Sequence, residues 1–154
     1  MGIRFDSDKK IFTLTTRDTM YQMQIGPVGH LLHLYYGPKT DDCFDYLQLP
    51  RDCGFSPNPY DHQQGRGWSL DTKAQEYSSQ HTGDYRVCSL ALETDTGISG
   101  TDLRYVNHEI LDHKYEITGM PSAFDRAGKA QTLSIILADD ATGVQVELLY
   151  GVFA

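Results

Sequence analysis

The sequence predicts an all-β protein, most simply an antiparallel β-sandwich, on three observations. Apolar and polar residues alternate with a period of two over several short segments. Clusters of Gly, Pro and Asp separate these segments, as expected between strands. No segment keeps the 3.6-residue period of a helix over three turns. The composition is that of one folded domain, since 40% of the 154 residues are hydrophobic and 22% are charged.

The first 36 residues predict a β-meander. Residues 11–15 and 19–25 each alternate, so that one face of each strand is apolar. Residues 26–29, Gly-Pro-Val-Gly, predict a turn. Residues 30–36 are apolar or aromatic nearly throughout, which is typical of a strand covered on both faces. Gly37 and Pro38 end this strand.

Residues 39–86 differ from the flanking segments. They contain three prolines, many Gly, Asp and Gln residues, and little periodicity. A segment of this length without regular structure inside a compact domain is usually functional. It also contains Trp68, the one tryptophan of the chain, and several tyrosines. Aromatic residues in an irregular segment favour a binding or interaction surface.

Strands resume in the second half of the chain. We expect five, at residues 87–94, 103–110, 114–118, 132–138 and 144–153. Asp139 and Asp140 lie in the turn between the last two strands, and we interpret them as turn residues.

The charge and the motifs exclude several classes of function. A net charge of -8 argues against binding to nucleic acid or to anionic membrane surfaces. No apolar run is long enough for a membrane span or a signal peptide. The six histidines are scattered, and no Cys-x-x-Cys pair, phosphate loop or dinucleotide motif occurs, so we expect neither a metal nor a cofactor. Cys43, Cys53 and Cys88 fit three reduced thiols of a cytoplasmic protein, with a Cys43–Cys53 disulfide as the alternative.

The acidic residues do not by themselves predict a catalytic site. Four aspartates, Asp41, Asp42, Asp45 and Asp52, lie in the irregular segment. A glycosidase needs two carboxylates at a set separation across the sugar. Spacing within a loop does not set that separation, and acids in loops are usually solvated, so we favour solvated acids over a catalytic pair. The serines also lack the Gly-x-Ser-x-Gly setting of a nucleophile elbow.

Several segments resemble the bacterial-type α-galactosidases of glycoside hydrolase family 36. The most specific are Ser-Leu-Asp-Thr-Lys-Ala-Gln-Glu-Tyr at residues 69–77 and Thr-Gly-Asp-Tyr-Arg at residues 82–86. Residues 31–37, 55–59, 102–105 and 142–148 follow the family's order and spacing. Two departures occur: Lys73-Ala74 stands where the family usually has Leu-Pro, and the stretch before Phe55 is one residue shorter.

The resemblance implies that residues 1–154 are the N-terminal β-sandwich region of a longer α-galactosidase. In that family this region is the front part of a β-supersandwich related to the mutarotase-like fold. The catalytic barrel follows, and its two aspartates perform a retaining hydrolysis of terminal α-linked galactose from oligosaccharides such as melibiose and raffinose. We therefore expect the barrel to lie outside this chain, which agrees with an apolar strand pattern that runs up to Ala154.

The resemblance also implies roles for three residues. Enzymes of this kind are homotetramers whose N-terminal domain reaches into a neighbouring subunit's active site, where an aspartate before the Phe-Ser-Pro-Asn-Pro motif contacts the sugar. The matching residue here is Asp52, for which a turn aspartate is the alternative. Arg66 and Trp68 are candidate interface anchors, or they pack within the loop.

Two other functions are compatible with a β-sandwich. One is a stand-alone carbohydrate-binding module that uses the aromatic residues around Tyr60 and Trp68. The other is a mutarotase-like enzyme with His and Glu side chains converging in a cleft, for which a chain of 154 residues is short.

Overall fold

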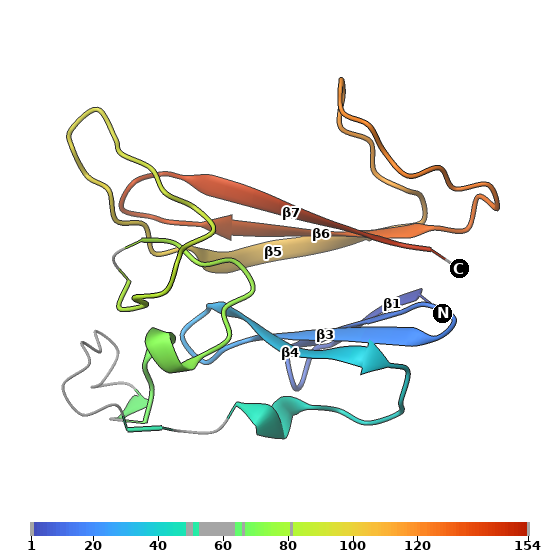
Figure 1. Ribbon diagram of the computed structural model, residues 1–154, viewed down its shortest axis with the longest axis horizontal. Coiled ribbons are helices and arrows are strands. Elements are labelled where there is room, and N and C mark those ends of the chain that lie inside the picture. Colours follow the sequence, from blue (N-terminus) through green and yellow to red (C-terminus); the bar gives the residue numbers. More distant parts are fainter. Residues whose placement is uncertain (1, 49–50, 53–63, 66, 81, 154) are drawn as a thin grey trace.

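The computed structural model describes residues 2–48, 51–52, 64–65, 67–80 and 82–153. Two antiparallel sheets face each other (Figure 1). The described residues of the irregular segment 39–86, the irregular middle, pass below the first sheet and then lie at the left end of the sandwich in this view (Figure 1). The two ends of the chain lie at the same end of the sandwich (Figure 1). The predicted all-β sandwich is therefore confirmed.

The first sheet is a meander in the order β1-β2-β3-β4. Its strands are β1 (Gly2–Asp6), β2 (Ile11–Thr15), β3 (Thr19–Ile25) and β4 (Leu31–Pro38). Strands β2 and β3 were predicted from their alternation and β4 from its nearly continuous apolar run, whereas β1 was not predicted. A bulge between Gln22 and Met23 shifts the register of β3 against β4.

The second sheet has three strands in the order β5-β6-β7. These are β5 (Arg104–Leu111), β6 (Gln131–Ala138) and β7 (Gln145–Val152). The β6–β7 turn confirms the role predicted for Asp139, whose carboxylate accepts hydrogen bonds from the Ala141 amide at 3.1 Å and the Thr142 hydroxyl at 2.6 Å. Among the described residues of the irregular middle, short 3₁₀ helices span Asp45–Leu47 and Leu70–Thr72.

The prediction of a strand at residues 87–94 was wrong. Leu90 forms one isolated parallel bridge with Ser79, and the Val87 side chain is 98% exposed. The Ser89 and Leu90 amides both donate to the Ser78 carbonyl, at 3.0 Å each. In a regular β-ladder successive amides do not share one carbonyl, so residues 87–94 do not form a strand.

The strand predicted at residues 114–118 was also wrong. The Tyr115 amide donates to the Thr132 hydroxyl at 2.9 Å, and this hydroxyl donates to the His113 carbonyl at 2.7 Å. The segment is therefore tied to a side chain of β6 and does not pair with the backbone of a neighbouring strand.

The core lies between the two sheets, where the alternating apolar residues of both meet. Buried residues of the first sheet are Phe12, Leu14, Met23, Ile25 and Leu31, and those of the second half are Leu103, Leu133, Ile135, Leu137 and Val152. Each such side chain contributes on the order of 1.5–3 kcal/mol by burial.

The irregular middle packs on the free edge of β4. Leu32 and Gln75 form an antiparallel bridge. A second apolar cluster of Val28, Leu32, Trp68 and Leu70 lies beside this bridge. Across the described residues, no helix has the length and apolar character needed to cross a membrane.

Candidate functional site

Asp52, the residue predicted to contact substrate, is exposed. The amide of its neighbour Arg51 donates to the Gly67 carbonyl at 3.0 Å. This bond joins the stretch that contains Asp52 to the stretch that contains Trp68. Asp52 therefore lies at the surface, where a carboxylate can accept hydrogen bonds from a ligand's hydroxyl groups.

Trp68 packs inside the domain, on residues of the first half of the chain as well as on the irregular middle. Its side chain is 6% exposed and contacts the apolar cluster on β4. The Lys73 ammonium lies 5.1 Å from the centroid of its ring, and Lys73 is itself 3% exposed. A buried indole offers no open face to a sugar, and an interface role for Trp68 stays a prediction. Arg66 and Tyr60 lie outside the described residues.

A small cavity of about 220 Å³ adjoins this region. It is lined by Gln24, Pro27, Leu32, Gln48, Gln64, Gly67, Trp68 and Lys73. Ligand cavities usually measure roughly 300–1,000 Å³, so this cavity is small for an oligosaccharide. Three amide side chains, the Trp68 indole and the Lys73 ammonium line this cavity, and Asp52 is not among its lining residues.

Two other acids of the irregular middle, Asp42 and Asp45, accept hydrogen bonds from other side chains. Asp45 accepts a hydrogen bond from the Lys9 ammonium at 2.9 Å, which lowers the pKa of its carboxyl. Asp42 accepts a hydrogen bond from the Thr40 hydroxyl at 3.1 Å. Neither arrangement places two carboxylates across a shared cleft, as a glycosidase requires.

Sequence reasoning missed a buried carboxylate between the sheets. The Glu76 side chain is 9% exposed. It accepts hydrogen bonds from the Tyr21 hydroxyl of β3, at 2.7 and 2.6 Å, and from the Tyr150 hydroxyl of β7, at 2.7 Å. His33 Nδ1 lies 3.6 Å from the carboxylate and 3.1 Å from the Tyr21 hydroxyl. Burial, with the Glu76 carboxylate beside them, raises the pKa of both phenols far above the usual value.

A polar cluster around Arg86 and Asp84 joins separate parts of the irregular middle. The Arg86 guanidinium donates to the Asp84 carboxylate at 2.8 and 2.7 Å, to the Leu70 carbonyl at 2.9 Å, and to the Lys73 carbonyl. The Asp84 side chain is 3% exposed and also accepts from the Gln75 amide at 2.8 Å. Burial acts to raise the pKa of Asp84, but the hydrogen bonds from Arg86 outweigh it and the pKa is lowered.

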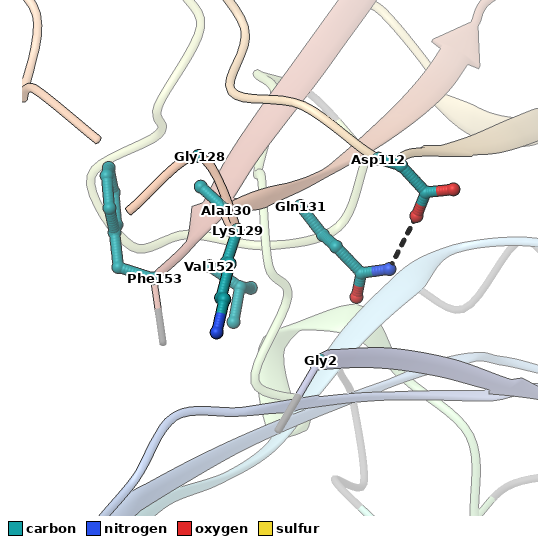
Figure 2. A pocket seen from close by; sticks show the side chains of 8 residues that line it. All are labelled: Gly2, Asp112, Gly128, Lys129, Ala130, Gln131, Val152 and Phe153. Carbon is teal, nitrogen blue, oxygen red and sulfur yellow. Dashed lines mark hydrogen bonds between the residues drawn. The ribbon is translucent and has the colours of Figure 1, made fainter. Parts of the chain in front are cut away.

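A larger cavity of about 480 Å³ lies at the end of the sandwich where the termini meet (Figure 2). Figure 2 shows Gln131 reaching toward Asp112, whose carboxylate accepts its amide hydrogen bond at 2.8 Å. Asp112 and Lys129 are the two ionisable residues in its lining. One engaged carboxylate is not the pair that glycoside hydrolysis uses. Among the described residues there is also no group of three potential metal ligands.

The structure is thus a two-sheet β domain in which the candidate substrate contact, Asp52, is exposed. The family model described as "Glycosyl hydrolase family 36 N-terminal domain" matches residues 29–154. The chain belongs to this family.

Two relatives agree over nearly the whole chain. The bifunctional α-galactosidase/sucrose kinase AgaSK of Mediterraneibacter gnavus is 47% identical over 99% of this chain, which covers 16% of that protein. The α-galactosidase AgaA of Geobacillus stearothermophilus is 34% identical over 97% of this chain, which covers 21% of its length.

Solved structures agree as well. The galactosidase domain of AgaSK has a TM-score of 0.93 at 47% identity, over 99% of this chain and 21% of that structure. The α-galactosidase AgaB of Geobacillus stearothermophilus has a TM-score of 0.89 at 32% identity, with the same shares covered. The chain thus spans about a fifth of the length of the relatives it matches.

Proposed function

We propose that this chain is the non-catalytic N-terminal domain of an α-galactosidase that removes terminal α-linked galactose from oligosaccharides. The observation that carries the proposal is 47% identity, over 99% of the chain, to an enzyme named as an α-galactosidase. The chain covers 16% of that enzyme, so the proposal places the retaining catalytic barrel outside residues 1–154. Asp42 and Asp45 accept hydrogen bonds from Thr40 and Lys9, which supports a non-catalytic role for this domain.

The proposed substrates are oligosaccharides of the melibiose and raffinose type. Variants of AgaA from Geobacillus stearothermophilus have been solved in complex with raffinose and with stachyose. These structures are 35% and 33% identical to this chain and cover 94% of it. Such likeness supports the same substrate class for the protein that contains this chain.

We further propose that the full-length protein is a cytoplasmic homotetramer. Cys43 and Cys88 are free thiols, which suits a reducing compartment, while Cys53 lies outside the described residues. Exposed apolar side chains, including Tyr85 at 74% and Phe124 at 82%, suit burial in an interface between subunits or domains. Light scattering of the full-length protein would measure the assembly directly.

An assay on an aryl α-galactoside tests the proposed division of roles. We expect the full-length protein to hydrolyse this substrate and the 154-residue chain to be inactive. Turnover by the chain alone would place a catalytic carboxylate pair within residues 1–154 and would contradict the proposal.

Asp52→Ala in the full-length protein is expected to raise KM about tenfold. One hydrogen bond from a sugar hydroxyl to a charged acceptor accounts for roughly 1.5–3 kcal/mol, of which the exposed site realises the lower part. Because Asp52 is exposed, the free energy of unfolding should change by less than about 0.5 kcal/mol. Steady-state kinetics and urea unfolding measure the two effects separately.

Asp41→Ala is the matched control. Asp41 is also an exposed aspartate of the irregular middle, and it lines a separate groove on the first sheet. Its removal should leave KM unchanged. An equal KM for Asp52→Ala and the unmutated protein would remove Asp52 from the substrate site.

A further inference from the structure

His33 connects the two stretches of chain that lead to and from the Asp52 region. It lies on β4, the edge strand of the first sheet. Its main-chain amide donates to the Ala74 carbonyl at 2.7 Å, and its carbonyl accepts from the Gln48 amide group at 3.1 Å. Gln48 precedes Asp52 along the chain, while Ala74 follows Trp68. One residue of an edge strand therefore anchors both stretches.

The main-chain pairing at this edge is short. The Glu76 amide donates to the Leu31 carbonyl at 2.9 Å, and Leu32 with Gln75 forms one isolated bridge. Two main-chain hydrogen bonds at the edge of a sheet contribute only modestly to stability, because each replaces hydrogen bonds to water. Side chains add to this pairing: the Gln75 amide donates to the Asp84 carboxylate at 2.8 Å, and Glu76 reaches between the two sheets.

The Glu76 side chain ties the segment to both sheets. It turns inward from the end of this segment and accepts hydrogen bonds from Tyr21 of the first sheet and Tyr150 of the second. A buried carboxylate is costly unless its oxygens are satisfied, and here two phenols satisfy both. Withdrawal of the segment from β4 would leave these phenols without that acceptor.

We infer that Glu76 is a positioning residue: its carboxylate fixes residues 74–76 on the edge of β4 and thereby sets the placement of Asp52. The link runs from Glu76 through the β4 backbone at His33 to Gln48, and through Trp68 and Gly67 to Arg51. This role rests on the proposed function, because it requires that Asp52 contact substrate.

Kinetics of the full-length protein test the inference. Glu76→Ala is expected to raise KM about tenfold while kcat changes less than about twofold, because misplacement of a binding group weakens binding without touching the reacting atoms. Glu76→Gln keeps the shape and one acceptor oxygen, and it should restore KM to within about threefold. In the Asp52→Ala background, Glu76→Ala should have no further effect on KM.

Glu147→Ala is the matched control, since Glu147 accepts a hydrogen bond from Ser134 at 2.7 Å but lies on the outer side of the second sheet. It should leave KM unchanged. If Glu76→Ala prevents folding, Tyr150→Phe replaces it, with Tyr105→Phe as its control. The Tyr105 hydroxyl pairs with His108 at 2.7 Å and not with Glu76.

Hydrogen exchange separates the inference from the proposed function. In Glu76→Ala or Tyr150→Phe, the amides of His33 and Glu76 should exchange at least about tenfold faster than in the parent, while those of β6 keep their protection. Unchanged exchange at these two amides would overturn the inference. Unchanged KM in the Glu76 variants, with KM raised by Asp52→Ala, would overturn it and leave the proposed function standing. Faster exchange with unchanged KM in Asp52→Ala would confirm the anchoring and remove Asp52 from the site.

Discussion

Phe12→Ala is expected to lower the free energy of unfolding by about 3–5 kcal/mol, the range for truncating a buried aromatic side chain. Phe12 is 0% exposed and lies between the two sheets. Its ring stacks on Phe5 with centroids 4.5 Å apart and meets the edge of His108 on β5 at 4.8 Å. Its removal would leave a cavity lined by both sheets, which neither sheet can fill without losing its own pairing.

Urea unfolding of the chain, followed by the fluorescence of Trp68, measures this change. Phe124→Ala is the matched control because the Phe124 side chain is 82% exposed. We expect it to change the free energy of unfolding by less than about 0.5 kcal/mol. A loss below about 1 kcal/mol for Phe12→Ala would contradict a core shared between the sheets.

The central strands could be predicted because the alternation of apolar and polar residues is complete within each strand. Leu133, Ile135 and Leu137 alternate along β6, and all three are buried. Strand β1 also alternates, with apolar Ile3 and Phe5, but it has only five residues and was not predicted. Its place depends on pairing with β2. Residues 87–94 have the composition of a strand but pair with no strand of either sheet that the structure describes. Whether a partner strand is available depends on the topology of the chain, which composition does not show.

The same distinction between local sequence patterns and distant contacts applies to the candidate site. Asp52 could be proposed from a local motif, although its exposed position alone is also that of a turn residue. Glu76 could not, because its partners Tyr21 and Tyr150 are 55 and 74 residues away along the chain. Nothing near Glu76 in the sequence indicates that it is buried. The two sheets must be assembled before these three side chains meet.

The second large effect concerns the polar cluster around Arg86 and Asp84. Arg86→Ala is expected to lower the free energy of unfolding by about 2–4 kcal/mol, since it removes charge-assisted hydrogen bonds and leaves a buried carboxylate without its cation. The guanidinium also holds the Leu70 and Lys73 carbonyls, which fixes the 3₁₀ turn beneath Trp68. Half of the Arg86 side chain is exposed, so solvent reduces the effect below that of a fully buried pair.

The pH dependence of this effect has a definite sign. The pKa of Asp84 is lowered from its usual value of 3.8 in the folded protein, so its stabilising contribution is present above that pH and is lost as pH falls through the folded pKa. The difference in unfolding free energy between the parent and Arg86→Ala should therefore be largest at neutral pH and should shrink below pH 3.8. Arg17→Ala, at an 85% exposed side chain 3.9 Å from Asp18, is the control and should have little effect at any pH. A difference that stays constant from neutral pH to pH 3 would show that packing of the Arg86 stem, and not its bonds to Asp84, holds this cluster.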